Sequence, residues 1–415
     1  MKKGFLLRIW LVALLVFTLT MVSAQNSFAD KLRIGVIYPL SGNMALLGKM
    51  SLEGAETARA EQNEKGGLLG KEIEFVIADA PDAKAAVAAA ERLITVEKVR
   101  LIIGTYSSSL SFAATNVANK HKVVYWELGA ISDPIVERGF KYVFRTCPAG
   151  SMYSYNALKC MAEYLAPKLG QEPSKLTVAM LYEDSLFGTT MAKYGHEAAK
   201  KYGIKVVADA PYNAKTTDLT SVILRLKAVK PDFILYPGYF TDQVLFFRQA
   251  KELRFYFKAN ISVGGSGLLA FGEALGNLSD GILCVGFTSL DTNPNFAKGI
   301  DKFKALFNKV MGKQPDGPYP LMNYMGTKAL LSVIGKANSM DAEAIRKAAL
   351  SVDIPMGGTE TGGGIKFDPN TGQNTRAITP IYQWQEAGTK LNTCWPEEAA
   401  VAKIIFPFPA WEERE

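Results

Sequence analysis

Two stretches of the chain begin alike: LRIGVIYPLSG at residues 32–42 and LTVAMLYEDSLFG at residues 176–188. Each is a nearly continuous apolar run that ends in a tyrosine, and each continues into a loop that carries serine and glycine. A strand that is apolar along its whole length is typical of a parallel sheet covered on both faces. The recurrence predicts two similar α/β units, each starting with a buried strand.

Strand and helix patterns alternate after both starting strands, which is the order expected for a parallel sheet wound on both sides. In the first unit we expect strands over 32–38, 72–78, 100–103 and 123–127, with helices over 48–63, 83–97 and 110–120. In the second unit we expect strands over 176–181, 205–208 and 232–235, with helices over 186–201, 218–229 and 242–253.

The end of the chain has a different pattern. We expect two helices over 295–310 and 319–337, and a shorter one over 341–350. The glycine-rich stretch 357–370 predicts a β-hairpin or a long surface loop, and a late strand is expected over 377–384. A late strand that follows helices often returns to an earlier sheet.

The first 29 residues have the composition of a secretory signal peptide. Lys2, Lys3 and Arg8 precede an apolar run over 9–22, and small residues at cleavage spacing end at Ala24 and again at Ala29. We therefore expect export to the periplasm, with cleavage near one of these two alanines. An uncleaved membrane anchor is the alternative, but the apolar run is short for a span.

The charge and the cysteines exclude some functions and leave one question open. The formal net charge of +7 falls by three when the signal peptide leaves, and no long basic run remains, so nucleic-acid binding is not expected. Cys147 with Cys160, and Cys284 with Cys394, are possible disulfides in an oxidising compartment, and four buried free thiols are the alternative.

The chain lacks the residue patterns of a metal site or an enzyme centre. The two histidines, His121 and His196, stand apart in lysine-rich helical contexts, and no spacing suits a metal. The sequence GGSG at 264–267 is one residue short of a nucleophile elbow. We therefore expect no cofactor and no catalysis.

A candidate anion site lies in IIGTYSSSLSFAAT, residues 102–115. An apolar strand leads through a glycine turn and three serines into a helix. Free backbone N–H groups and the helix dipole favour an anion at such a helix start, and Ser108 and Ser109 can add hydroxyl donors. The carboxyl edge of a doubly wound sheet is also where ligands bind. A plain serine N-cap is the structural alternative.

The next strand ends in YWELGAISDP, residues 125–134, at the neighbouring edge. It offers the Trp126 and Glu127 side chains, the Ala130 carbonyl and the Ser132 hydroxyl. Glu127 either neutralises a cation on a ligand or pairs with a nearby lysine. In the second unit the strand ends supply Phe187, Tyr239 and Asp242.

The chain resembles the periplasmic leucine/isoleucine/valine-binding protein family of ABC importers, over nearly all of its mature length. The resemblance is carried by IGVIYPLSGNMALLG (34–48), GGLLGKEIEFVIADAPDAKAAV (66–87), IIGTYSSS (102–109), DPIVERGFKYVFRT (133–146), DFILYPGYFTD (232–242) and GPYPLMNY (317–324). It implies the type I periplasmic-binding fold: two lobes joined by a three-strand hinge that close over a ligand.

The resemblance also implies a ligand site. Ser108 and Ser132 match the hydroxyls that hold the ligand carboxylate in amino-acid binders of this family, and Ala130 matches a backbone carbonyl. Phe187 and Tyr239 match the aromatic lids. The acidic residue that pairs the α-ammonium falls in a loop that has the sequence VGGSG here, where Ser266 or Gly265 replaces it.

These matches lead to a prediction for organisation and function. Lobe 1 is expected to hold residues 30–147 and 287–374, and lobe 2 residues 148–286 and 375–415. The protein is expected to be a monomer that passes a small molecule to an inner-membrane ABC permease, and a ligand-sensing module is the alternative. The resemblance favours a branched-chain amino acid, with Glu127 or Asp242 as the ammonium partner. If neither reaches the cleft, Tyr106, Trp126 and Tyr319, with the two lids, suit an aromatic or aliphatic carboxylate better.

Overall fold

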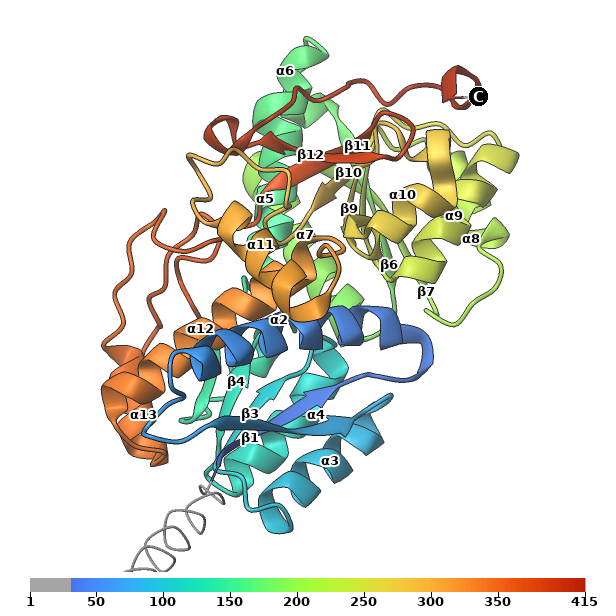
Figure 1. Ribbon diagram of the computed structural model, residues 1–415. Coiled ribbons are helices and arrows are strands. Elements are labelled where there is room, and N and C mark those ends of the chain that lie inside the picture. Colours follow the sequence, from blue (N-terminus) through green and yellow to red (C-terminus); the bar gives the residue numbers. More distant parts are fainter. Residues whose placement is uncertain (1–30, 415) are drawn as a thin grey trace, which may run out of the picture.

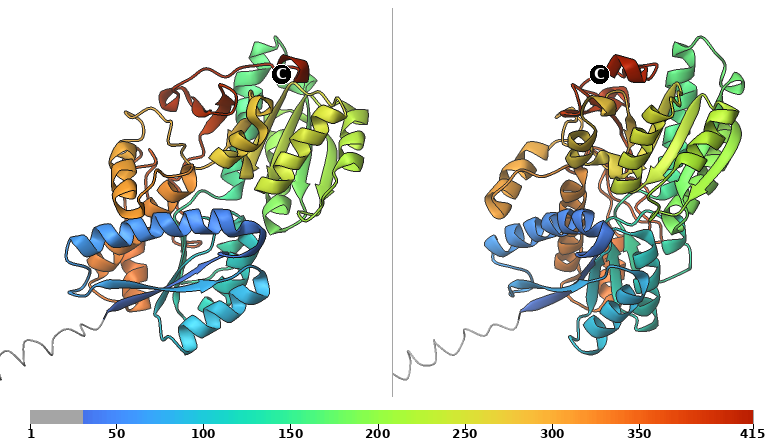
Figure 2. Two further views of the ribbon diagram at one scale, coloured as in Figure 1. Left: turned by 45° about the vertical axis from the view of Figure 1, so that its right-hand side comes forward. Right: turned by 90° about the vertical axis from the view of Figure 1, so that its right-hand side faces the viewer.

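The computed structural model describes residues 31–414 as two α/β units, which Figures 1 and 2 show as separate bodies of sheet and helix. The expected signal peptide and its cleavage sites lie outside the described residues. The strands are β1 (Leu32–Tyr38), β2 (Ile73–Asp79), β3 (Leu101–Gly104), β4 (Val124–Glu127), β5 (Val143–Arg145), β6 (Thr177–Glu183), β7 (Lys205–Tyr212), β8 (Phe233–Gly238), β9 (Ala259–Gly264), β10 (Leu283–Val285), β11 (Ile381–Gln385) and β12 (Lys390–Trp395).

Helices alternate with these strands, as the pattern predicted. They are α2 (Ala45–Glu64), α3 (Ala83–Thr95), α4 (Ser108–Lys120), α5 (Gly150–Cys160), α6 (Ala166–Lys168), α7 (Leu186–Tyr202), α8 (Thr220–Val229), α9 (Phe240–Glu252), α10 (Leu269–Leu275), α11 (Ile300–Met311), α12 (Pro318–Ala337) and α13 (Ala342–Leu350). A π-helical turn over Met161–Leu165 joins α5 to α6. Among the described residues, no helix is both long and apolar enough to span a membrane.

The first lobe is built on a five-stranded parallel sheet in the order β2-β1-β3-β4-β5. Its two faces are both covered, which explains why β1 is apolar throughout. Ile37 and Ile102 pack under α3 and α4, whereas Ile34 and Val36 belong to the core on the face covered by α2. Helix α12 packs along α2, and α11 joins them.

The second lobe is built on a seven-stranded sheet in the order β12-β11-β10-β9-β8-β6-β7. Strands β6 to β10 run parallel to one another, and β11 pairs antiparallel with β10 and β12. The late strand therefore returns to an earlier sheet, as the sequence suggested. It begins at Ile381 and not at residue 377, directly after Pro380, which has no N–H to donate to a ladder. The fold class predicted from the sequence is confirmed.

One expectation for the chain's end needs correction, and the open question about the cysteines is answered. The helix expected from residue 295 begins at Ile300, because turns occupy 293–299 and Gly299 has a φ of 125°. The cysteines form no disulfide: all four are free and buried, which is the second of the two alternatives.

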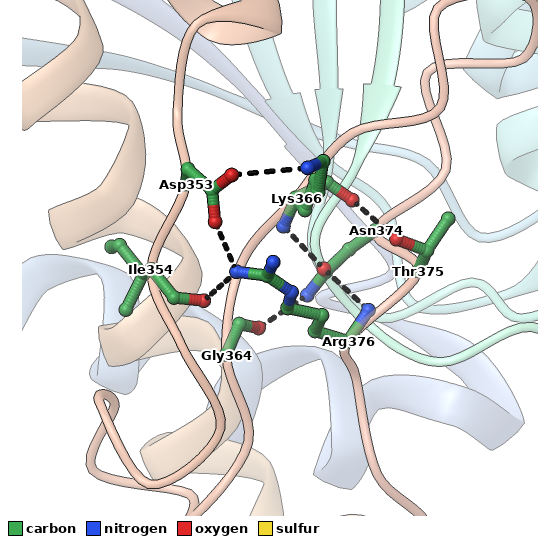
Figure 3. A network of polar contacts seen from close by, with 7 residues as sticks. All are labelled: Asp353, Ile354, Gly364, Lys366, Asn374, Thr375 and Arg376. Carbon is green, nitrogen blue, oxygen red and sulfur yellow. Dashed lines mark hydrogen bonds and ion pairs between the residues drawn. The ribbon is translucent and has the colours of Figure 1, made fainter.

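The glycine-rich stretch is a long loop fastened by polar contacts, and Figure 3 shows part of this network. Asn374 Oδ1 accepts the N–H groups of Lys366 and Arg376, each at 3.0 Å, and Asn374 Nδ2 donates to Gly364 O at 2.9 Å. The same amide nitrogen donates to Thr146 O at 3.1 Å. Buried Asn374 thus holds two of the predicted crossing segments side by side, next to the end of β5.

Candidate functional site

A cavity lies between the two sheets, at the carboxyl ends of their parallel strands. Its water-accessible volume is about 40 Å³. It is lined by Tyr106, Ser107, Ser108, Gly129, Ile131, Tyr153, Phe187, Tyr239, Val263, Gly264, Gly286, Phe287, Tyr319 and Tyr382. These residues lie at the end of β9, follow β3, β4, β6, β8 and β10, or belong to α5, α12 and β11. Ligands of open α/β sheets bind at this edge.

The turn between β3 and α4 supplies the polar end of the cavity. Ser107 is the N-cap residue of α4, but its hydroxyl makes no capping hydrogen bond. The first N–H groups of a helix have no partner within the helix, so they and the Ser107 and Ser108 hydroxyls are available to a ligand. Tyr106, just before them, has a φ of 92°. This strained turn directs donors at the cavity.

Aromatic rings form most of the remaining wall. Tyr319 lies edge-on to both Tyr106 and Phe287, with ring centroids 5.6 and 5.4 Å apart, and Phe187 lies 5.7 Å from Tyr239. Burial raises the pKa of each of the three tyrosines well above its ordinary value, so the phenols stay neutral at any physiological pH. The wall is therefore flat, uncharged and suited to an apolar or aromatic body.

Glu127 does not line the cavity. Its carboxylate is fully buried and accepts the backbone N–H groups of Thr105, Leu128, Gly129 and Ala130 at 2.8–3.0 Å, together with the Ser111 hydroxyl. Burial raises the pKa of Glu127, and these donors act in the opposite direction. The carboxylate fastens the β3–α4 turn to the loop after β4, and no lysine among the described residues pairs with it.

Asp242 also lies outside the cavity wall. It stands in the first turn of α9, is buried, and accepts the Tyr212 hydroxyl. Burial raises its pKa to about 6. Its other carboxylate oxygen, Oδ1, has no hydrogen-bond partner among the described residues.

The other sequence candidates divide into those in the wall and those behind it. Tyr106, Ser108, Phe187, Tyr239 and Tyr319 line the cavity, whereas Ser109, Trp126, Ala130, Ser132 and Ser266 do not. Trp126 Nε1 donates to Gly326 O at 3.0 Å, within the core of the first lobe. Ala130 O accepts from the buried Arg145 at 3.2 Å, and the Ser132 hydroxyl donates to Leu186 O at 3.0 Å. The indole of Trp384 donates to the Ser266 carbonyl at 2.7 Å.

Six side chains in the wall were missed by the sequence argument: Ser107, Ile131, Tyr153, Val263, Phe287 and Tyr382. Ser107 was visible as the first of three serines. Phe287 follows Gly286, a predicted crossing point, and a large apolar residue directly after such a glycine is a usable signal. The sequence did not indicate Tyr153 or Tyr382 as wall residues, because α5 and the place of β11 in the sheet were not predicted.

The wall contains no charged side chain among the described residues. The same part of the chain holds no cluster of histidine, cysteine, aspartate or glutamate that could bind a metal. An anion can be met by hydroxyls and by the start of α4, but an ammonium group enclosed here has no opposite charge beside it. An unpaired buried charge is strongly unfavourable.

Comparisons with known proteins agree with this architecture. A family model described as periplasmic binding protein matches residues 31–389. Leu/Ile/Val-binding protein homolog 7 of Brucella abortus is 38% identical over 96% of this chain and 99% of its own length. Homolog 8 of Brucella suis is 34% identical over 96% and 98%.

Solved structures show the same fold. A leucine binding protein, LivK, from Thermotoga maritima superposes with a TM-score of 0.75 at 24% identity, covering 87% of this chain and 97% of that one. A solute binding protein of an ABC transporter from R. palustris, in complex with benzoate, gives a TM-score of 0.74 at 18% identity, covering 90% and 98%.

Proposed function

Because this chain belongs to the periplasmic binding protein family, we propose that it captures a small carboxylate in the interlobe cavity and delivers it to an ABC permease in the inner membrane. Members of this family bind solutes outside the cytoplasm and are not enzymes. Three further points are part of the proposal: export by the N-terminal signal peptide, a monomeric state, and a ligand that leaves the site chemically unchanged.

The ligand that the cavity suits best is an aromatic carboxylate. One observation carries this choice: the wall combines Ser107, Ser108 and the start of α4 with a set of aromatic rings, and it offers no acidic side chain. In the proposed complex the two serines and the helix N–H groups hold the carboxylate, because burying that charge requires several donors at once. Phe187, Tyr239 and Tyr319 enclose the ring.

A branched-chain amino acid is the second candidate. It is favoured by the relatives named as Leu/Ile/Val-binding protein homologs, at 34–38% identity over nearly the full chain. For such a ligand the ammonium group must be met by backbone carbonyls and phenol oxygens, since Glu127 is saturated by its own loop and Asp242 lies behind the wall.

Calorimetric titration of the purified mature protein separates the two candidates. We expect benzoate to bind with a measurable dissociation constant and leucine to bind much more weakly. Leucine binding without benzoate binding would move the assignment to the second candidate, and binding of neither would reject both. Chromatography of the released ligand checks the absence of turnover: benzoate should be recovered unchanged after long incubation.

A further inference from the structure

Two tyrosine hydroxyls at the cavity wall have no hydrogen-bond partner among the described residues. Tyr153, on α5, and Tyr382, on β11, are 2% and 3% exposed, and both line the cavity. Burial raises the pKa of both phenols, together with nearby thiols and tyrosines, so both hydroxyls are neutral. A hydroxyl that faces a cavity and has no protein partner is free to bind a polar group of a ligand, and here two such hydroxyls face the same cavity.

The Tyr382 hydroxyl occupies a space that two glycines leave open. A Cβ atom on Gly286 would lie 1.9 Å from Tyr382 Oη, and a Cβ atom on Gly267 would lie 2.7 Å from it. Neither glycine has a positive φ, so their backbone conformations do not require glycine. Glycine is required at both positions because the Tyr382 phenol oxygen occupies the space that a side chain would fill. The fold therefore makes room for a polar group that it then leaves unpaired.

These phenols approach the cavity from the lobe opposite the serines. Ser107 and Ser108 start α4 of the first lobe. Tyr382 belongs to the sheet of the second lobe, and α5, which carries Tyr153, packs against α7 and β10 of that lobe. Phe287 and Tyr319 connect the two ends of the cavity. The ring centroid of Phe287 lies 6.3 Å from that of Tyr153 and 5.4 Å from that of Tyr319. The Tyr319 ring in turn contacts Tyr106.

We propose that Tyr153 and Tyr382 bind a second polar group of the ligand, a ring hydroxyl, so that the natural ligand is a hydroxylated aromatic carboxylate. This inference rests on the proposed function, because it places the carboxylate at Ser107 and Ser108. A phenol both donates and accepts one hydrogen bond, so a pair of neutral tyrosine hydroxyls satisfies a ring hydroxyl completely. A site built to hydrogen-bond a substrate hydroxyl discriminates strongly against the analogue that lacks it.

The test compares benzoate with 3-hydroxybenzoate and 4-hydroxybenzoate by calorimetry. We expect the wild type to bind one of the hydroxylated acids at least about tenfold more tightly than benzoate. Tyr382→Phe and Tyr153→Phe should each reduce this ratio, and the double variant should abolish it. Tyr164→Phe is the matched control: it is partly buried on the π-helical turn outside the cavity, and it should leave the ratio unchanged.

The outcomes separate this inference from the proposed function. Benzoate bound as tightly as both hydroxylated acids, or an unchanged ratio in the double variant, overturns the inference and leaves the proposed function standing. Binding of leucine alone overturns both. The wild-type ratio needs no variant, so the inference stays testable even if a substitution impairs folding.

Discussion

Ser108 and Ser109 are neighbours in sequence with different surroundings. Ser108 is 2% exposed and lines the cavity, and its oxygen accepts the N–H of Ser132 at 3.3 Å. Ser109, one position further along the first turn of α4, is partly exposed and lies outside the wall. The pair therefore offers a substitution and its own control within one helical turn.

We expect Ser108→Ala to weaken benzoate binding by about 1–3 kcal/mol, because a hydrogen bond to a charged group is lost. Ser109→Ala should leave the dissociation constant within about a factor of two, since an exposed hydroxyl outside the wall makes no contact with the ligand. Calorimetry of both variants measures this difference. Equal effects of the two substitutions would place the carboxylate elsewhere.

Asp242 makes stability depend on pH in a direction that can be stated. Burial raises its pKa to about 6, above the ordinary value of about 4. The native state therefore holds this proton more tightly than the unfolded chain. The resulting stabilisation is full below pH 4 and is lost as the pH rises through 6.

Replacing this carboxyl by an uncharged amide, Asp242→Asn, should remove that dependence. Between pH 4 and pH 7 the wild type should lose about 2–3 kcal/mol of its free energy of unfolding relative to the variant, from about 1.4 kcal/mol per pKa unit. Urea titrations at the two pH values measure both proteins. Parallel pH profiles would show that Asp242 is ionised in the folded protein with an ordinary pKa.

Position along a strand is the residue-level information that the sequence carries about the site. Ser108, Phe187 and Tyr239 follow parallel strands directly, and such residues meet at one edge of the sheet. Glu127 was a candidate at the same edge and lies outside the cavity wall. A carboxylate at a strand end has the same sequence context whether it faces a ligand or its own loop, so the sequence left its role open. The four backbone N–H groups that donate to Glu127 belong to loop residues, and hydrophobic periodicity does not predict the conformation of a loop.

At the level of elements, a glycine sets the distance between helices α2 and α12. A Cβ atom on Gly54 of α2 would lie 2.1 Å from the Pro320 carbonyl oxygen of α12. Gly335, near the end of α12, has no atom closer than 3.5 Å to such a Cβ. Both glycines are helical and neither has a positive φ.

We expect Gly54→Ala to destabilise the protein by about 1–3 kcal/mol or more, because two backbones must move apart. Gly335→Ala should stabilise it by about 0.5–1 kcal/mol, because alanine favours a helix and here meets no obstacle. Thermal unfolding of both variants is the measurement. A destabilising Gly335→Ala would mean that this end of α12 packs more tightly than its geometry indicates.

Elements with a clear hydrophobic pattern were predicted, whereas several others were missed, among them α5, β9 and β10. Strands such as β1 and helices such as α7 carry enough residues for a period to emerge. Strands β5 and β10 have three residues each, so their register comes from neighbours and not from their own pattern. The antiparallel pairing of β11 with β10 also depends on segments about a hundred residues apart, which local sequence does not reveal.

At the level of the whole molecule, direct hydrogen bonds join the lobes. The Ser132 hydroxyl, after β4, donates to the Leu186 carbonyl at the start of α7 at 3.0 Å. The Tyr319 hydroxyl, on α12, donates to the Gly264 carbonyl after β9 at 2.9 Å. Both bonds cross from one sheet's edge to the other's, which is the arrangement expected if the lobes close over a ligand. The exact lobe boundaries near residues 147, 286 and 376 stay a prediction.

Ser132→Ala should therefore weaken ligand binding without touching the ligand. The bond exists only in the closed form, so its loss shifts the open–closed equilibrium by about 0.5–1.5 kcal/mol, or about 2–10-fold in dissociation constant. Small-angle scattering should show that saturating benzoate still compacts the variant and the wild type alike. An unchanged affinity, or no compaction in either protein, would contradict closure through this contact.

The reactivity of the four buried thiols can report how often each part of the core opens. Cys147, Cys160, Cys284 and Cys394 are at most 4% exposed, and burial raises the pKa of each, so an alkylating reagent meets almost no thiolate in the native state. Each labelling event then marks an opening of the core around that residue. Cys284 and Cys394 report on the sheet of the second lobe, and Cys147 on the segment after β5. Mass spectrometry of partly labelled protein would therefore time the opening of each region separately, with no engineered probe.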